Sequence, residues 1–555
     1  MNQVNYVPYH VHSMLSNGVT NVDSVTRFES YIELAKQCGM TAFGFSEHGN
    51  IFEWYFKKKA IEDAGMKYLH GVELYITMNE TDKVRDNYHC VAIARDYEGF
   101  LELNRLTSKA FTRSDNHFYY APRVMISELE TTSDHILITS ACVGGAMSQR
   151  VPEADRERFF QFMLKNRHRC FLEVQHHQDF IQVEHNQFLY KLSKQYGIPL
   201  IAGTDTHALN SRHVAGRSML QISKDVRFAN EDRWDLTFKS YDELCDAYQR
   251  QGSLPEEVWL EAIANTNVMA DMVQPFEIDL SNKYPNIYDN PSETFRQTVY
   301  QAAEAHPYAI KRHGREKLFA RIEEELAVYD KVGATPYMLL KNYLTSWERD
   351  HGIFCGPGRG SVSGSMIAYL LHITEMDSMR FDLNFFRFMN PSRISLADVD
   401  TDYSETDREK VKSFLLNDHL NLPNIQTAEI ITFNTIATKG SIRDIAKAFN
   451  VLHNEGKGSV HYTDMEIRAL CDAVDKDGNV DERIRANNKE LFEYVDIVTG
   501  TIVSIGSHPC GVLVADHDLA SEVGLCTTSG SKYPVSCLYM KELDEMNWVK
   551  WDVLG

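Results

Sequence analysis

Short apolar runs alternate with amphipathic helical patterns up to about residue 265, and this alternation restricts the possible folds more than any other feature. Residues 41–46, 89–94, 135–140 and 198–203 are rich in strand formers, whereas residues 25–39 have helical spacing. Such alternation is typical of a βα barrel or a layered sheet. Because barrels of this kind bind ligands at the carboxyl ends of their strands, we expect functional residues there.

Histidines, acids and one cysteine collect at those predicted strand ends. They are His10, His12, His48, Glu73, His89, Cys142, Asp205 and His207. A single histidine is more often a satisfied core or surface residue, so the prediction rests on the whole ordered set. Imidazoles with carboxylates and a thiolate suit a multinuclear Zn²⁺ or Mn²⁺ site. Metal-bound water becomes hydroxide near neutral pH, which indicates phosphoester hydrolysis.

Length and composition place broad limits on the chain. With 555 residues it exceeds the size of a single hydrophobic core, so several domains are expected. No stretch approaches the roughly 20 apolar residues of a membrane span, and no signal peptide is visible, so we expect a cytoplasmic protein, in the host cytoplasm if it is viral. Ten cysteines without CxxC pairs favour reduced thiols. A net charge of −21 means that any DNA site must be locally basic.

A glycine- and serine-rich loop, GPGRGSVSGS at 356–365, leads into an apolar run. The residues before it, from about 266 to 350, have helical spacing and include the basic stretch 311–317. Backbone amides of such a loop and the start of the following helix can hold a phosphate. Taken alone, glycine-rich turns more often satisfy tight backbone geometry.

Carboxylates follow this loop. Asp398, Asp400 and Asp402 alternate along a predicted strand and therefore project from one side, and Asp552 lies in a second predicted strand. Acids this close repel one another unless cations compensate them, which favours Mg²⁺ over the alternative of solvated edge-strand acids. Two Mg²⁺ ions there would support nucleotidyl transfer.

A basic stripe lies between these acids in the sequence. Lys439, Arg443 and Lys447 recur every four residues and share one face of a predicted helix. A solvated basic face is the default interpretation of such a stripe, and a DNA backbone is the other candidate occupant.

The metal-ligand set resembles a known domain. In order and context, the segments YHVHSMLSNG, FSEHGN, GVELYI, HCVAIA, ITSACVGG and AGTDTHAL are similar to the polymerase and histidinol phosphatase (PHP) domain, over about residues 5–210. The resemblance implies a distorted βα barrel with up to three metal ions. That family usually has an aspartate where this sequence has Asn17, in a segment that looks two residues shorter. Active hydrolysis, a structural metal site and an empty site therefore stay open.

Later segments resemble the C-family replicative DNA polymerases, the DNA polymerase III alpha-subunit family. They are GPGRGSVSGS, FFRFMNPSRISLADVDTDY, ITFNTIATKGSIRDIAKAF, GSHPCGVLVA and VKWDVLG, in the family's order. The resemblance implies template-directed addition of deoxynucleotides to a primer with two Mg²⁺ ions. It implies catalytic Asp398, Asp400 and Asp552, substrate-binding Gly360, Ser361, Ser365, Arg387, Arg393 and Lys550, and DNA-binding Lys439, Arg443 and Lys447.

The resemblance also implies an α/β multidomain architecture. A distorted βα barrel (PHP) over 1–265 precedes a polymerase-beta-like nucleotidyltransferase palm over 266–428, whose first part includes a helical connecting layer. An inserted helical thumb follows over 429–500, and the palm resumes over 501–555. Primed DNA and deoxynucleoside triphosphates are the implied partners. Family members continue into fingers and clamp-binding regions, so a further C-terminal region or a second polypeptide, and a sliding clamp, are also expected.

Other functions compete with this interpretation. A stand-alone PHP phosphatase for small phosphomonoesters and a non-catalytic DNA-binding scaffold are possible, but a second set of carboxylates counts against both. X-family repair polymerases also combine a palm with a PHP domain, although there the PHP domain follows the polymerase. Within the C-family interpretation, the PHP domain is predicted to be a 3′–5′ proofreading exonuclease.

Overall fold

The computed structural model describes residues 5–226, 233–390 and 399–555. These residues pack into two compact units. Unit 1 comprises Met1–Glu277, Thr432–Gly506 and Gly524–Cys526, and unit 2 comprises Ile278–Ile431, Ser507–Val523 and Thr527–Gly555.

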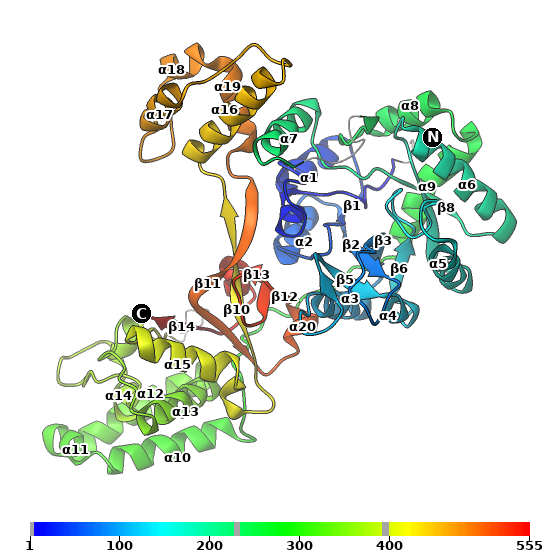
Figure 1. Ribbon diagram of the computed structural model, residues 1–555. Helices are drawn as coiled ribbons and strands as arrows, with labels where there is room; N and C mark the ends of the chain where they lie inside the picture. Colours follow the sequence, from blue (N-terminus) through cyan, green and yellow to red (C-terminus); the bar gives the residue numbers. More distant parts are fainter. Residues whose placement is uncertain (1–4, 227–232, 391–398) are drawn as a thin grey trace. The chain divides into compact units, whose positions relative to one another are not determined.

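A curled mixed sheet flanked by helices forms the larger part of unit 1 (Figure 1). The strand order is β4-β5-β2-β3-β6-β7-β8, and β1 also pairs with β2. The strands are β1 (Ala42–Phe45), β2 (Lys67–Thr77), β3 (Tyr88–Ala94), β4 (Phe118–Tyr119), β5 (Ala121–Met125), β6 (Ile136–Thr139), β7 (Cys170–Gln175) and β8 (Leu200–Gly203).

The opening segment of the chain joins the two ends of this sheet. Ser46, next to β1, donates its N–H to Val11 O at 2.9 Å, and His12 donates its N–H to Thr206 O, just beyond β8, at 2.7 Å. Residues near the start of the chain thus connect the β1 side with the β8 side, although they are not assigned as a strand themselves. The predicted mixed α/β class with a distorted βα barrel is confirmed.

Helices of unit 1 begin where the sequence offers capping side chains. Ser240 and Glu243 form a reciprocal capping box at the start of α8. The helix α9 continues through the predicted boundary at residue 265, and unit 1 extends to Glu277. The helices are α1 (Phe28–Gln37), α2 (Trp54–Asp63), α3 (Tyr97–Ala110), α4 (Ile126–Glu130), α5 (Glu153–Lys165), α6 (Phe180–Tyr196), α7 (Ser211–Ser223), α8 (Tyr241–Gln251) and α9 (Glu256–Met272), with the 3₁₀ helix η1 (Met14–Gly18).

Residues 432–506 add a helical group to unit 1. It contains α16 (Thr438–Asn454), α17 (Asp464–Asp472), α18 (Glu482–Asn487) and α19 (Lys489–Val498). Helices α16 and α19 pack against α7 through an apolar cluster that includes Leu220, Ile442 and Leu491 (Figure 1). Because the apolar residues of α16 recur at helical spacing, its opposite face is left to solvent. That face carries Lys439, Arg443 and Lys447, all exposed.

Unit 2 is built on a second mixed sheet. Its strands follow the order β13-β10-β11-β14-β9, with β10 parallel to β13, β11 antiparallel to β14, and β14 parallel to β9. The strands are β9 (Thr401–Asp402), β10 (Gln426–Thr435), β11 (Ile502–Ala515), β13 (Val535–Tyr539) and β14 (Lys550–Leu554), while the short β12 (Leu525–Cys526) belongs to unit 1. Along the chain, β10 leads into residues 432–506 and β11 leads out of them.

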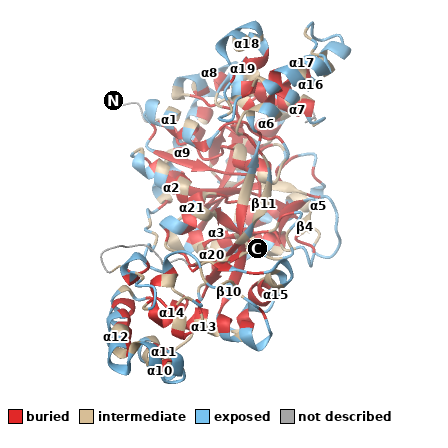
Figure 2. Ribbon diagram, turned by 90° about the vertical axis from the view of Figure 1, so that its left-hand side faces the viewer, coloured by how far each residue is buried: buried red, intermediate tan, exposed pale blue. Residues whose placement is uncertain are grey.

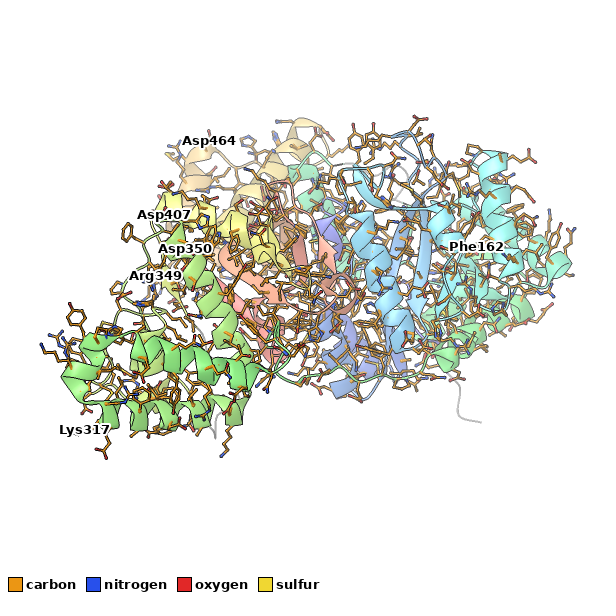
Figure 3. The ribbon with its side chains drawn as sticks, turned by 90° about the horizontal axis from the view of Figure 1, so that it is seen from below. Phe162, Lys317, Arg349, Asp350, Asp407 and Asp464 are labelled. Carbon is orange, nitrogen blue, oxygen red and sulfur yellow. The ribbon has the colours of Figure 1, made fainter. Side chains whose placement is uncertain are left out.

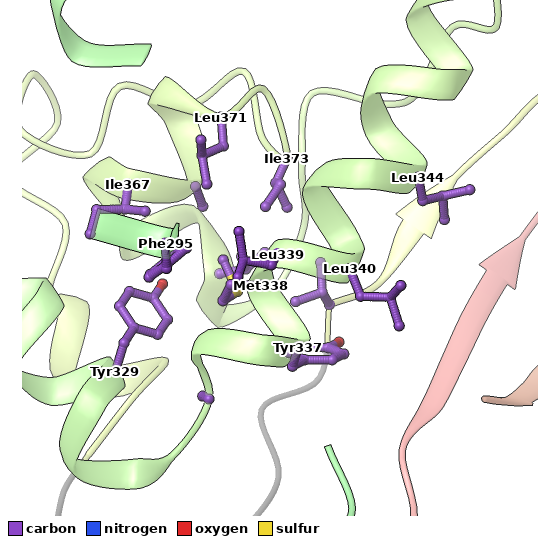
Figure 4. Packing of buried hydrophobic residues seen from close by; sticks show 14 of the residues in the cluster. Phe295, Tyr329, Tyr337, Met338, Leu339, Leu340, Leu344, Ile367, Leu371 and Ile373 are labelled. Atoms are coloured by element: carbon purple, nitrogen blue, oxygen red, sulfur yellow. The ribbon is translucent and has the colours of Figure 1, made fainter. Parts of the chain in front are cut away.

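Helices of unit 2 enclose an apolar core. Phe295, Tyr329, Leu340 and Ile367 from four helices meet in one cluster (Figure 4), and exposed residues occupy the outer helix faces (Figure 2). Lys317, in the predicted basic stretch, extends away from α12 (Figure 3). The helices are α10 (Pro291–Glu304), α11 (Pro307–His313), α12 (Arg315–Val332), α13 (Thr335–Asp350), α14 (Met366–Leu370), α15 (Glu405–Leu416), α20 (Leu519–Glu522) and α21 (Met540–Glu545), with the 3₁₀ helices η3 (Ser361–Gly364), η4 (Phe385–Arg387) and η5 (His419–Asn421).

Two general features complete the description. Within the described ranges, no helix combines the length and the apolar character that crossing a membrane requires. No disulfide bond joins any of the ten cysteines, all of which lie in the described ranges.

Buried neutral histidines predict that unit 1 loses stability in mild acid. Burial lowers the pKa of His70 to about 3 and those of His177 and His185 to about 4, whereas histidines in the unfolded chain titrate near about 6.5. Between those values the unfolded chain binds more protons, so stability falls as the pH is lowered, by on the order of 1 kcal/mol for each histidine at about pH 5.5. Thermal unfolding of the metal-free chain should show a lower midpoint at pH 5.5 than at pH 7.5. An equal or higher midpoint would contradict this.

Candidate metal centres

The predicted ligands of the barrel converge at one edge of the sheet. Glu73 on β2 bridges to His48, which follows β1, and His89 opens β3, the antiparallel neighbour of β2. The segment after β8 reaches the same edge through the bridge between Val11 and Thr206. Three overlapping groups of ligand atoms result: His12, Asp23, His48 and His207; His10, His12 and Glu73; and His48, Glu73 and His89.

The distances between these atoms match the spacing around a tetrahedral metal ion. Asp205 Oδ1 lies 3.4 Å from both His10 Nε2 and His12 Nε2. His207 Nε2 lies 3.4 Å from Asp23 Oδ2. Ligands about 2.0–2.2 Å from Zn²⁺ lie roughly 3.3–3.6 Å from one another. The distances between ligand atoms in the barrel cluster are therefore compatible with coordination of a shared metal ion.

Several of these atoms are buried without hydrogen-bond partners in the described part of the chain. They are His10 Nε2, His12 Nε2 and Asp23 Oδ2, while His48 Nδ1 and Glu73 Oε2 make no regular hydrogen bond in the described ranges but lie 2.8 Å from each other. Buried polar atoms are nearly always satisfied, because an unpaired one costs free energy. Cations coordinated by these atoms would satisfy them together, so the residues present fit a metal centre.

Electrostatics give His12 and Glu73 the protonation states that metal binding requires. At His10 and His48, by contrast, nearby acidic groups outweigh burial and raise the pKa well above its usual value, so a metal ion must displace protons there. Burial, together with repulsion from His48 and His207, lowers the pKa of His12 to about 4, which leaves its ring neutral. Burial opposes the ionisation of Glu73, but the nearby histidines outweigh it and hold the pKa of this carboxyl well below its usual value. Metal ions bind neutral imidazoles and ionised carboxylates.

A surrounding layer of hydrogen bonds orients the ligands. His10 Nδ1 contacts Glu173 Oε1 at 2.6 Å, which leaves Nε2 toward the cluster. Ser16 donates its hydroxyl proton to Glu47 at 2.7 Å and lies 3.2 Å from His12 Nδ1. Such outer contacts fix ring orientation and tautomer in metal sites.

Asn17 lies outside the ligand groups, and Asp23 provides the carboxylate instead. The Asn17 side chain accepts N–H groups from Asp23 at 2.7 Å and Ser24 at 2.9 Å, and donates to Ser24 O at 2.7 Å and Ile502 O at 2.8 Å. All its hydrogen-bonding capacity is used to shape the loop that presents Asp23. Asp23, and not Asn17, is the residue whose carboxylate lies with His12, His48 and His207 in a group that could hold a metal ion.

Cys142 lies at the margin of the cluster. Its Sγ is 3.4 Å from His89 Nδ1 and accepts the N–H of Gly144 at 3.4 Å. Burial, with Asp205 and Glu73 nearby, raises the pKa of this thiol well above its usual value. A bound cation would be needed to hold it as a thiolate.

A second set of acids lies on neighbouring strands in unit 2. The parallel register pairs Val553 with Thr401, so Asp552 on β14 and Asp400, which directly precedes β9, are brought close together. Asp552 Oδ1 is buried and has no hydrogen-bond partner in the described ranges. Asp398 and Arg393 lie outside the described residues. Of the predicted alternating strand, the structure describes Thr401–Asp402 as β9.

The glycine-rich loop contributes an arginine to these acids. Arg359 Nη1 lies 3.0 Å from Asp402 Oδ1, and its Nε lies 3.5 Å from Asp400 Oδ2. Gly360 is in the left-handed region, with φ of 69°, and follows directly. The loop therefore places the Arg359 guanidinium beside Asp400 and Asp402, whose negative charges repel each other and need a compensating positive charge.

The start of α14 is already occupied by a side chain. Glu325 accepts the N–H groups of Met366 at 2.8 Å and Ile367 at 3.1 Å and the hydroxyl proton of Ser365 at 2.7 Å. Ser365 is fully buried and caps α14, whereas Ser361 and Gly360 are exposed. Among the predicted phosphate contacts in the loop, the exposed Gly360 and Ser361 are the accessible ones.

The other predicted substrate contacts in the described ranges are Lys550 and Arg387. Lys550, on β14, pairs with Asp544 and lies 3.0 Å from Met540 Sδ. Arg387 ends the short helix η4 and is exposed.

Comparisons with known proteins match this arrangement. The family model described as the bacterial DNA polymerase III alpha NTPase domain matches residues 293–555, and the PHP domain model matches residues 8–177. The chain belongs to the DNA polymerase III alpha-subunit family. It is 26% identical to DNA polymerase III subunit alpha of Aquifex aeolicus, covering 99% of this chain and 51% of the relative. The alpha subunit of Borreliella burgdorferi is 28% identical, with 99% and 48% covered.

The chain therefore spans about half the length of the curated relatives it matches. Among solved structures, an amidohydrolase from Chromobacterium violaceum is 13% identical, with 37% of this chain and 88% of that chain covered. Its TM-score of 0.26 is too low to bear on fold or function.

Sequence reasoning missed two residues of these centres. Asp23 belongs to no quoted motif, but it is the only acid between His12 and Glu29, and a search for a carboxylate near the first histidine pair could have found it. Arg359 lies inside the quoted glycine-rich loop of this alpha-subunit family chain. The sequence led us to expect phosphate binding by the amides and hydroxyls of that loop, and the positive charge of Arg359 was not considered.

Substitution of Asn17 should weaken metal binding at the barrel cluster. Asn17→Ala removes three hydrogen bonds to the Asp23 loop and one to Ile502 O, and such outer-contact losses typically cost roughly 10- to 100-fold in metal affinity. Asn17→Asp should also weaken binding, because a carboxylate cannot donate to Ser24 O and Ile502 O. Titration with Zn²⁺ and Mn²⁺ tests both variants.

Asn116→Ala is the matched control, because Asn116 is buried and donates to Asn79 O and Asp82 O, neither of which belongs to the cluster. Tighter metal binding by Asn17→Asp would mean that residue 17 reaches the ions directly, contrary to this geometry.

Proposed function

We propose that this chain carries two metal-dependent centres of a DNA polymerase: one that adds deoxynucleotides to a primer 3′ end, and one that hydrolyses phosphoesters. The observation that carries the first is the register that brings Asp400 and Asp552 close together next to the glycine-rich loop with Arg359. Family membership makes primed DNA and deoxynucleoside triphosphates the natural substrates.

Asp398, Asp400 and Asp552 would hold two Mg²⁺ ions at the polymerase centre. Bound Mg²⁺ would activate the primer hydroxyl and stabilise the charge of the leaving pyrophosphate. Arg359, now paired with Asp400 and Asp402, would turn to the triphosphate once a cation compensates these acids. Gly360, Ser361, Ser365, Arg387, Arg393 and Lys550 are the other proposed triphosphate contacts.

The barrel cluster would be a hydrolytic centre with Zn²⁺ or Mn²⁺. Asp23 supports this over an empty site, because it supplies the acidic ligand that Asn17 does not. His10, His12, His48, Glu73, His89, Cys142, Asp205 and His207 are the other proposed ligands. Metal-bound hydroxide would attack a phosphodiester. Within a polymerase, the natural use of this chemistry is 3′–5′ removal of mispaired nucleotides.

The exposed stripe of Lys439, Arg443 and Lys447 on α16 is the proposed contact with the DNA backbone. Its positive charge stands out on a chain with a net charge of −21. We keep the proposed division into PHP domain (1–265), palm (266–428 and 501–555) and thumb (429–500). The compact grouping of residues 432–506 with unit 1 describes packing and does not test this division.

The intact enzyme would include more than this chain. Because the matched relatives are about twice as long, fingers supplied by a further region or a second polypeptide, and a sliding clamp, are the proposed partners.

Trimming of a mismatched primer tests the hydrolytic centre. On a 5′-labelled, 3′-mismatched primer-template with Mn²⁺ or Zn²⁺ and no nucleotides, the chain should shorten the primer. His12→Ala should abolish shortening because two ligand groups share His12, whereas Asp552→Asn should leave it intact. If no metal supports shortening, or if the His12→Ala variant still shortens the primer, the exonuclease proposal is contradicted.

Extension of a matched primer tests the polymerase centre. With Mg²⁺, nucleotides and the missing region supplied, the wild-type chain and His12→Ala should extend the primer, and the isosteric Asp552→Asn should not. Extension by Asp552→Asn at the wild-type rate would contradict both the proposed catalytic role of these carboxylates and the two-metal mechanism. Hydrolysis of a simple phosphomonoester without any action on DNA would favour the stand-alone phosphatase, and DNA binding without turnover would favour the scaffold.

A further inference from the structure

A pocket of about 280 Å³ lies in unit 1, outside the metal cluster. Its walls include Met14, Val25 and Asn210 on one side and residues 496–501 on the other. Each of the three named residues follows a cluster residue by two or three positions, namely His12, Asp23 and His207. The pocket is thus formed by the same chain segments that hold the metal ligands.

Two arginines line this pocket without an acidic partner. Across the described ranges, the side chains of Arg27 and Arg212 make no ion pair or hydrogen bond, and both are exposed. Asp496, the acid in the pocket wall, is paired with Arg485. Glu53 is close enough to Arg27 to interact electrostatically, but no carboxylate in the described ranges lies within ion-pair distance of either guanidinium.

The backbone at Gly500 makes room for Arg27. A Cβ atom at this position would lie 2.6 Å from a guanidinium nitrogen of Arg27, and Gly500 has a left-handed φ of 85°. Any side chain there would push the guanidinium away and strain the backbone. Arg27 is thus held against the pocket wall by close packing, with no ion pair to hold it.

Among the uncharged residues of the pocket wall, the Thr501 side chain lacks a hydrogen-bond partner within the described ranges and His213 has one. Thr501 is 1% exposed, and its Oγ1 has no hydrogen-bond partner in the described part of the chain. His213 Nδ1 lies 2.8 Å from Thr26 Oγ1, which itself accepts the N–H of Leu209 at 3.2 Å. The hydroxyl proton of Thr26 can then go to Nδ1, which favours the His213 tautomer with its proton on Nε2.

We propose that this pocket binds a phosphate group of a nucleic-acid strand, held by Arg27 and Arg212. Paired guanidinium groups match phosphate oxygens in geometry and charge. The volume suits one phosphate with part of its sugar and is too small for a larger ligand. A strand is favoured over free phosphate because the pocket walls continue directly into the segments that carry the metal ligands. The identity of the strand as a substrate rests on the proposed function, whereas phosphate binding does not.

Arginine footprinting on the wild-type chain tests the pocket. Phenylglyoxal modification, read out by peptide mass mapping, is compared with no ligand, with a single-stranded oligonucleotide, and with inorganic phosphate. The oligonucleotide should protect Arg27 and Arg212 and leave Arg167, an exposed arginine on another surface without an ion pair, unprotected. Protection by inorganic phosphate alone would contradict the assignment to a strand, and protection by neither would overturn the pocket.

A matched pair of variants gives the second readout. Arg27→Gln with Arg212→Gln should lower the slope of log affinity for single-stranded DNA against log salt by about 1.4, at roughly 0.7 for each lost phosphate contact. Arg167→Gln should leave the slope unchanged. An unchanged slope in the double variant would overturn the proposal. Neither readout depends on catalysis. If the primer is trimmed but Arg27 and Arg212 are not protected, only this inference is rejected. If Arg27 and Arg212 are protected but the primer is not trimmed, only the hydrolytic centre is rejected.

Discussion

The barrel depends on the compensation of one buried carboxylate. Glu73 lies 2.8 Å from His48 Nδ1, 2.9 Å from His89 Nδ1 and 3.3 Å from His10 Nε2, and it is fully buried. An uncompensated carboxylate in this place would cost several kcal/mol. Segments distant in the sequence converge around it, and they also bring His12 Nε2 and Asp23 Oδ2, which have no hydrogen-bond partner in the described ranges. Divalent cations are the species that would satisfy acids and imidazoles together.

The negative charges of the acids in unit 2 are compensated in a different way. Asp400 and Asp402 are at least partly accessible to solvent, and the exposed guanidinium of Arg359 compensates them. Exposed ion pairs contribute little to stability, so this pairing can be exchanged for metal ions and phosphates at small cost. The difference between a buried cluster and a partly exposed pair of strands would suit the two different centres that we propose.

Local periodicity made much of this predictable. The alternation of apolar runs and helical patterns predicted the mixed sheet and its functional edge, and the spacing of Lys439, Arg443 and Lys447 predicted an exposed basic face on α16. Sequence motifs identified the histidines because strand ends bring them together. Asp23 was missed because its position depends on the loop that Asn17 shapes, and that loop has no periodic pattern.

Long-range packing explains the other differences. The occupation of the α14 amides by Glu325 depends on the approach of two segments forty residues apart, which no local pattern encodes. The same applies to residues 432–506, whose packing against α7 places them in unit 1 through contacts such as that between Leu220 and the α16 face.

Anomalous diffraction from crystals grown with Mn²⁺ tests the central claim, that one chain holds two separate metal centres, most directly. The account predicts strong peaks among His12, Asp23, His48 and His207, and a further peak beside Asp400 and Asp552. Peaks at both places would establish the ligands without reference to activity. A barrel cluster that stays without a peak at saturating Mn²⁺ and Zn²⁺ would contradict the account.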